Sequence, residues 1–150
     1  MLCPFCGHDD QIVLNTRGTH KGTSIWRRRR CTKCFNIYTT YEKIRLNYIT
    51  VVKKDKRKVR FNRAKLFAGI YHATYNNKEF DNGKAAILAE DVTEKVERYL
   101  VKQQILEITT TKLSNIVIEI LKEKDPQVSI NYYVYFKKPN NIKEIKNFSK

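Results

Sequence analysis

The sequence contains no long apolar segment. None of its apolar runs approaches the ~20 residues that a helix needs to cross a bilayer, so we expect no membrane role. The first 20 residues also lack the apolar stretch of an export signal, and a cysteine already stands at position 3. These absences disfavour a secreted, disulfide-bonded domain. We therefore expect a cytoplasmic protein whose thiols are reduced.

Signatures of catalysis and of phosphate-binding loops are missing as well. Neither Gly-x-x-x-x-Gly-Lys nor Gly-x-Gly-x-x-Gly occurs in the chain. The three histidines are scattered, and no catalytic apparatus is visible around them. We therefore expect a binding protein and not an enzyme.

Acidic residues are few. The 150 residues include 15 Asp and Glu against 30 Lys and Arg, which gives a net charge of +15. The excess is uneven, because residues 1–65 hold 17 basic and four acidic side chains. A polyanion such as nucleic acid is the expected partner, and it should meet the N-terminal half of the chain.

All four cysteines lie in two Cys-x-x-Cys pairs, Cys3 with Cys6 and Cys31 with Cys34. Two such pairs supply the four thiolates of a tetrahedral zinc site, with Zn–S bonds of ~2.3 Å. Iron in a rubredoxin-like site would use the same ligands, although the basic setting favours binding over electron transfer. We expect one structural Zn²⁺ per chain.

Four consecutive arginines, Arg27 to Arg30, lead directly into the second cysteine pair, and Arg17 lies in the same insert. A ribbon held by metal should form strands near residues 11–15, 24–30 and 36–41. Side chains alternate along a strand, so the arginines should project in two pairs. A solvated basic edge strand is the alternative, but contact with nucleic acid is favoured.

The rest of the chain, with 41% hydrophobic residues overall, can bury one modest core. Residues 48–54 and 57–61 read as a β-hairpin. Apolar residues with helical spacing then predict helices from Asn62 to about residue 76, at 83–101 and at 111–124. A fourth segment at 126–138 is ambiguous between helix and strand, and a short helix is expected around residues 142–148. The fold class is α+β, with domains at 1–46 and 47–138 and a tail at 139–150.

Three lysines are candidates for holding a triphosphate. Lys53 and Lys54 end the first hairpin strand, and Lys65 falls in the first turn of the following helix. Exposed N–H groups at a helix N-terminus attract phosphate, and Lys65 would add charge there. On charge alone, solvated lysines would be the better interpretation.

The order of these motifs resembles that of the bacterial NrdR family. The resemblance covers nearly the whole chain and includes both the ribbon and the beginning of an ATP-cone. It is carried by Cys3-Pro4-Phe5-Cys6-Gly7, Asn15-Thr16-Arg17, the arginine run into Cys31, Tyr38-Thr39-Thr40-Tyr41-Glu42, Val51-Val52-Lys53-Lys54, Phe61-Asn62-Arg63, Lys65-Leu66 and Gly69.

The resemblance implies a zinc-ribbon and ATP-cone repressor of ribonucleotide reductase genes. Its partners would be double-stranded operator DNA in the bacterial nucleoid, ATP or dATP as effector, and further copies of the chain in a nucleotide-dependent homo-oligomer. The implied site residues are Cys3, Cys6, Cys31 and Cys34 for zinc; Arg17, Arg27, Arg28, Arg29 and Arg30 for DNA; and Val51, Lys53, Lys54 and Lys65 for nucleotide.

The chain also departs from the family pattern. Ile37 stands where an arginine is common, Lys56 replaces a turn glycine, and Val59 replaces a frequent glutamate before Pro-Phe. The C-terminal family motif is altered at residues 129–137, including Asn131. Two other functions remain open: a zinc-ribbon module that binds RNA or a polymerase, and a detached cone that regulates ribonucleotide reductase by direct contact.

Overall fold

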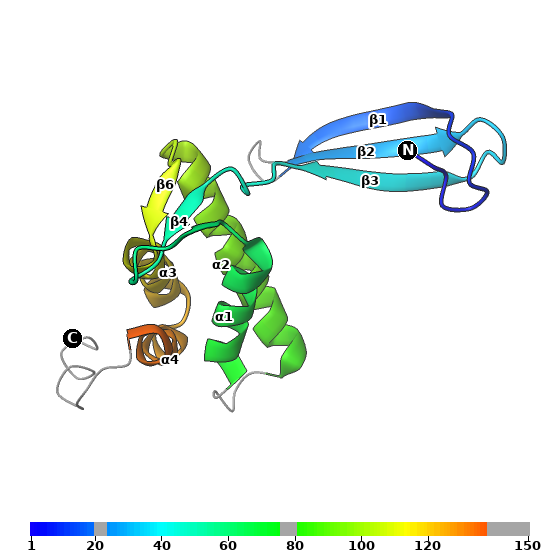
Figure 1. Cartoon of the computed structure of the whole chain (residues 1–150). Coiled ribbons are helices and arrows are strands. Elements are labelled where there is room, and N and C mark those ends of the chain that lie inside the picture. Colours follow the sequence, from blue (N-terminus) through cyan, green and yellow to red (C-terminus); the bar gives the residue numbers. More distant parts are fainter. Residues whose placement is uncertain (20–23, 76–80, 138–150) are drawn as a thin grey trace. The chain divides into compact units, whose positions relative to one another are not determined.

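The computed structural model describes residues 1–19, 24–75 and 81–137 (Figure 1). The chain divides into two compact units, Met1–Arg45 and Leu46–Lys150. No helix in the described part of the chain is long and apolar enough to span a membrane. The predicted α+β fold is confirmed. The helix expected around residues 142–148 lies outside the described residues.

The first unit is a three-stranded antiparallel sheet with strands β1 (Gln11–Thr19), β2 (Ser24–Cys31) and β3 (Ile37–Lys43). The central strand is β2, which carries the arginine run. A register shift between Val13 and Asn15 bulges β1 locally. All three predicted strands are present. Strands β1 and β2 are longer than predicted, and β3 is shifted toward the C-terminus. In each case the backbone pairing continues beyond the apolar and aromatic residues on which the prediction was based.

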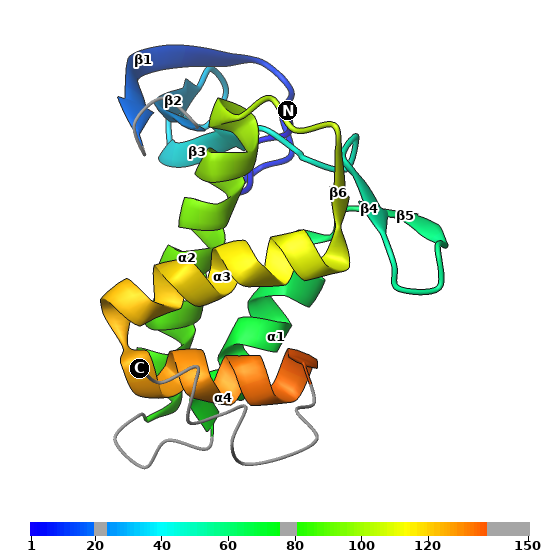
Figure 2. The same ribbon diagram turned by 90° about the vertical axis from the view of Figure 1, so that its left-hand side faces the viewer.

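The second unit begins with the predicted hairpin of β4 (Thr50–Val52) and β5 (Lys58–Arg60), visible in Figure 2. Lys56, which replaces the family's turn glycine, has a φ of 64°. The hairpin is present as predicted, and the sheet has a third strand that was not predicted, β6 (Glu107–Thr109), which pairs in parallel with β4. Three residues with a single buried apolar side chain, Ile108, give almost no local sequence signal.

Four helices follow, namely α1 (Arg63–Tyr75), α2 (Asn82–Lys102), α3 (Thr110–Lys124) and α4 (Pro126–Lys137). Side-chain oxygens accept hydrogen bonds from backbone N–H groups at their N-termini. These oxygens belong to Asn62, Asp81, Thr109 and Asp125. The ambiguous fourth segment is therefore a helix, since Asp125 and Pro126 supply a strong helix start.

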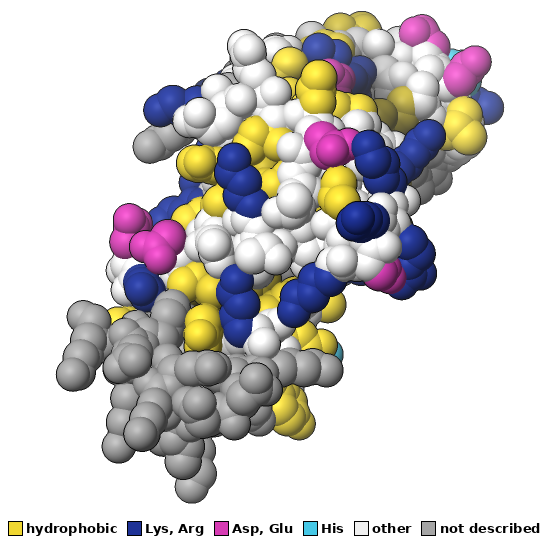
Figure 3. Space-filling model, turned by 60° about the vertical axis from the view of Figure 1, so that its left-hand side comes forward, with side chains coloured by type: hydrophobic (Ala, Val, Ile, Leu, Met, Phe, Trp, Pro, Cys, Tyr) yellow, Lys and Arg dark blue, Asp and Glu magenta, His cyan; other side chains and the backbone are white. Residues whose placement is uncertain are grey.

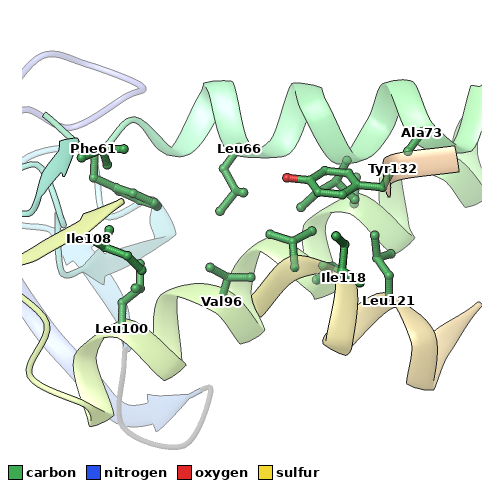
Figure 4. Packing of buried hydrophobic residues seen from close by; sticks show 14 of the residues in the cluster. Phe61, Leu66, Ala73, Val96, Leu100, Ile108, Ile118, Leu121 and Tyr132 are labelled. Carbon is green, nitrogen blue, oxygen red and sulfur yellow. The ribbon is translucent and has the colours of Figure 1, made fainter. Parts of the chain in front are cut away.

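Buried apolar side chains from all four helices and from the sheet form one core (Figure 4). On α2, Leu100 is fully buried, whereas Tyr99 is 39% exposed. Gly69 permits a close approach of α1 and α4, because a Cβ there would lie 3.2 Å from the ring of Phe136. Arg63 of α1 also forms ion pairs with Glu90 and Glu97 of α2.

Candidate zinc centre, basic ribbon face and nucleotide pocket

The two cysteine pairs come together at one end of the ribbon. The Sγ atoms of Cys3 and Cys34 are 3.7 Å apart, those of Cys6 and Cys31 are 3.6 Å apart, and all four lie within 4.8 Å of one another. A regular tetrahedron of thiolates with ~2.3 Å bonds to zinc has sulfur–sulfur edges of roughly 3.8 Å. The donor set and its spacing therefore fit a Cys₄ zinc ion.

The backbone around the cysteines supports this geometry. Gly7 adopts a φ of 71°, which allows the chain to turn sharply after Cys6. The backbone N–H of Asn36 lowers the pKa of Cys34 to about 6. The backbone N–H of His8 acts to lower the pKa of Cys6, but burial and the other three cysteines raise it to about 12. A bound dication stabilises thiolates and would remove this conflict between neighbouring negative charges.

The arginine run on β2 is divided between the two faces of the sheet. Arg27 and Arg29 lie on one face, where both form ion pairs with Glu42, at 2.9 and 3.6 Å. Arg29 also donates a 2.9 Å hydrogen bond from Nε to Thr40 Oγ1, and its side chain is only 12% exposed. The alternation expected for a strand is thus present, and it gives the two pairs different surroundings.

Arg28 and Arg30 project from the opposite face and are exposed. Neither forms an ion pair within the described residues. Arg17 shares this face, because it is paired with Trp26 across β1 and β2, and its guanidinium lies 5.7 Å from the centre of the Trp26 ring. We call the surface made by Arg17, Trp26, Arg28 and Arg30 the basic ribbon face.

A cavity of about 300 Å³ opens in the second unit, between the hairpin and helices α1, α3 and α4. This volume is at the lower end of the range for small-molecule sites. Its cationic lining residues are Lys53, Arg60 and Lys65, and none of the described residues that line it is acidic. The apolar part of the lining includes Val51, Leu66, Leu113 and Phe136.

The structure brings three of the four expected nucleotide-site residues together in this cavity. Val51, Lys53 and Lys65 line it, whereas Lys54 does not. The lining also includes residues that the sequence did not single out, namely Arg60, Thr110, Ser114, Tyr132 and Phe136. Most come from α3 and α4, more than 40 residues from the lysines. Only the folded helices place them beside the hairpin.

Lys and Arg side chains are spread over the face of the molecule shown in Figure 3, with apolar side chains exposed between them. The Asp and Glu side chains on that face are scattered and do not form one acidic patch. This agrees with the charge excess of the sequence and with an anionic ligand or partner.

Comparisons with known proteins assign both units. Residues 1–42 match the family described as Transcriptional repressor NrdR-like, N-terminal domain, and residues 49–141 match the ATP cone domain. The chain is thus a zinc-ribbon and ATP-cone protein, with a metal-binding module followed by a nucleotide-binding domain. Its relatives over nearly the whole chain are named transcriptional repressors.

Two relatives illustrate the similarity. The Transcriptional repressor NrdR of Dictyoglomus thermophilum is 35% identical over 96% of this chain and 93% of its own length. The Transcriptional repressor NrdR of Clostridium botulinum (strain Loch Maree / Type A3) is 34% identical over 98% of this chain and 97% of its own. The chain belongs to the NrdR family of transcriptional repressors, which confirms the resemblance seen in the sequence.

Proposed function

We propose that this protein represses ribonucleotide reductase genes by binding their operator DNA through the zinc ribbon. ATP or dATP in the cone controls which homo-oligomer forms, and the protein works in the cytoplasm on nucleoid DNA. Residues 1–46 carry DNA binding and residues 47–138 carry nucleotide binding, with 139–150 as a tail. No catalytic step is part of this function.

The observation that supports DNA binding most directly is the basic ribbon face. Three exposed guanidinium groups, those of Arg17, Arg28 and Arg30, lie on one side of a metal-held sheet beside Trp26. Arginine pairs well with phosphate oxygens and can bind guanine with two hydrogen bonds. Arg27 and Arg29 lie on the other face with Glu42, where we propose that they support the shape of the sheet and contribute positive potential.

The cavity supports nucleotide control. Lys53, Arg60 and Lys65 bring three positive charges to one ligand-sized space. Lys65 lies in the first turn of α1, and the N-terminus of that helix adds partial positive charge nearby. We propose that these groups bind the phosphates of ATP or dATP and that Val51 contacts the nucleoside.

DNA binding by the intact protein tests this proposal. Labelled ribonucleotide reductase promoter DNA, random DNA and an RNA copy of the promoter are titrated with protein alone, with ATP and with dATP. We expect preference for the promoter DNA, and we expect its affinity to differ between nucleotide states. Preference for RNA, or equal binding to promoter and random DNA in all three states, would contradict the proposal.

A further inference from the structure

The lining of the cavity combines cationic and apolar side chains. Its three cationic residues, Lys53, Arg60 and Lys65, are exposed. Helices α1, α3 and α4 contribute buried or half-buried apolar side chains to the wall, among them Leu66, Leu113 and Phe136. A nucleotide that places its phosphates against the cations can place its nucleoside against this apolar wall.

One polar atom in that wall lacks a partner. Tyr132 is 1% exposed, and its hydroxyl points along the core toward Leu66 (Figure 4). Within the described residues this hydroxyl forms no hydrogen bond. The other two lining hydroxyls are engaged, since Thr110 donates to the Val52 carbonyl at 3.1 Å and Ser114 donates to the Thr111 carbonyl at 3.0 Å. Within the described residues, the buried side-chain atoms without a hydrogen-bond partner are Arg27 Nε and Thr93 Oγ1, so the Tyr132 hydroxyl is accessible from the cavity and can bond a ligand there.

The surroundings of Tyr132 fit a flat, neutral group. Its ring stacks on Phe136 with centroids 4.4 Å apart, and Phe136 lines the same cavity. Burial raises the pKa of the Tyr132 phenol, so it stays neutral at physiological pH and can both donate and accept. Flat aromatic and aliphatic walls suit a planar base better than a sugar or a phosphate.

We infer that the Tyr132 hydroxyl hydrogen-bonds the edge of the adenine base and is a specificity-determining residue of the cone. This inference rests on the proposed function, because it concerns the nucleotide held by Lys53, Arg60 and Lys65. A site that offers a hydrogen-bonding group to the base discriminates against ligands that leave that group unpaired.

Calorimetric titration of the intact, zinc-loaded protein with ATP, dATP and GTP tests the inference on wild type and Tyr132→Phe. We expect Tyr132→Phe to weaken ATP and dATP binding by the same factor, roughly three- to tenfold, with GTP affinity unchanged. We expect an equal loss of affinity for ATP and dATP because both nucleotides carry the same adenine base. The unfolding midpoint without nucleotide should stay about the same, because the variant removes a hydroxyl that forms no hydrogen bond within the described residues.

Tyr135→Phe is the matched control. It makes the same change on the same helix, but Tyr135 is 56% exposed, stacks on His72 and does not line the cavity. Unchanged ATP affinity in Tyr132→Phe, a loss for ATP but not dATP, or an equal loss for GTP would each overturn the inference. Absence of nucleotide binding by wild type would instead overturn the proposed function and this inference together.

Discussion

Arg28 and Arg29 are adjacent in the sequence and have opposite environments in the structure. Arg28 is exposed on the basic ribbon face, whereas Arg29 is bound to Thr40 and Glu42. The strand alternation alone predicted that they would face different ways. Glu42 and Thr40 of β3 decide which two of the four arginines are bound within the ribbon and which two stay exposed. Their position on the same face as Arg27 and Arg29 becomes clear only from the register of β2 and β3.

We predict that Arg28→Ala and Arg29→Ala have different effects. Arg28→Ala should weaken DNA binding without destabilising the ribbon. If Arg28 contacts a phosphate, the magnitude of the slope of log affinity against log salt concentration should decrease by roughly 0.9. If Arg28 instead hydrogen-bonds a guanine, the discrimination at that base pair should decrease by ~1–3 kcal/mol. Arg29→Ala should instead destabilise the ribbon by about 1 kcal/mol through the lost hydrogen bond.

DNA titrations at several salt concentrations, with operator and random DNA, measure the first effect, and thermal unfolding measures the second. Identical losses for both variants on both DNAs would reduce the arginine run to a non-specific basic patch.

The candidate site residues differ in how far the sequence could predict them. The zinc ligands follow from spacing alone, because Cys3, Cys6, Cys31 and Cys34 are all the cysteines in the chain. The hairpin lysines could be proposed, but Tyr132 and Ser114 read as ordinary core positions of helices. Their place in the cavity depends on how α3 and α4 pack against α1, which local patterns do not encode.

At the scale of elements, the cysteine turns fix the ends of the ribbon strands. Cys31 is the last residue of β2 and is fully buried, so its thiolate joins the central strand to the metal. Three helices of the second unit were predicted from apolar spacing and caps and are present, and the fourth segment, ambiguous in the sequence, is also a helix. The strand β6 was missed because its partner β4 lies more than 50 residues away.

We predict that Cys31→Ser unfolds the ribbon and leaves the helical unit folded. Metal binding supplies on the order of 10 kcal/mol to small zinc modules, whereas the second unit has its own apolar core. Zinc analysis should fall from about one ion per chain to nearly none, helical circular dichroism should persist, and hydrogen exchange in residues 1–45 should accelerate. Specific DNA binding that survives chelation would refute the structural role of the metal.

At the scale of the whole molecule, two compact units have separate chemistry. The ribbon holds the metal and the exposed arginines, and the second unit holds the cavity. If nucleotide in the cone changes DNA binding by the ribbon, the two events are linked by a free energy of coupling. Assembly of several chains is the proposed link, since a nucleotide shifts an oligomer equilibrium only if it binds the oligomers with different affinities.

We predict that Lys65→Ala removes ATP and dATP binding together with any nucleotide-dependent change in oligomer size. The variant loses one of the three cavity cations, while its zinc content stays the same. Calorimetry measures binding, and gel filtration with and without each nucleotide measures assembly. Lys54→Ala serves as the control and should have a smaller effect, because Lys54 does not line the cavity. An oligomer change that persists in Lys65→Ala would separate assembly from this cavity.

The parallel pairing of β4 with β6 also constrains how the second unit is synthesised and folds. The hairpin leaves the ribosome first, but the second edge of β4 stays open until α1, α2 and then residues 107–109 have been made. Contacts between such distant segments form slowly, and an open strand edge is a site for aggregation. Nascent chains that stop before β6 should therefore depend on chaperones, and C-terminal truncations that remove it should be insoluble.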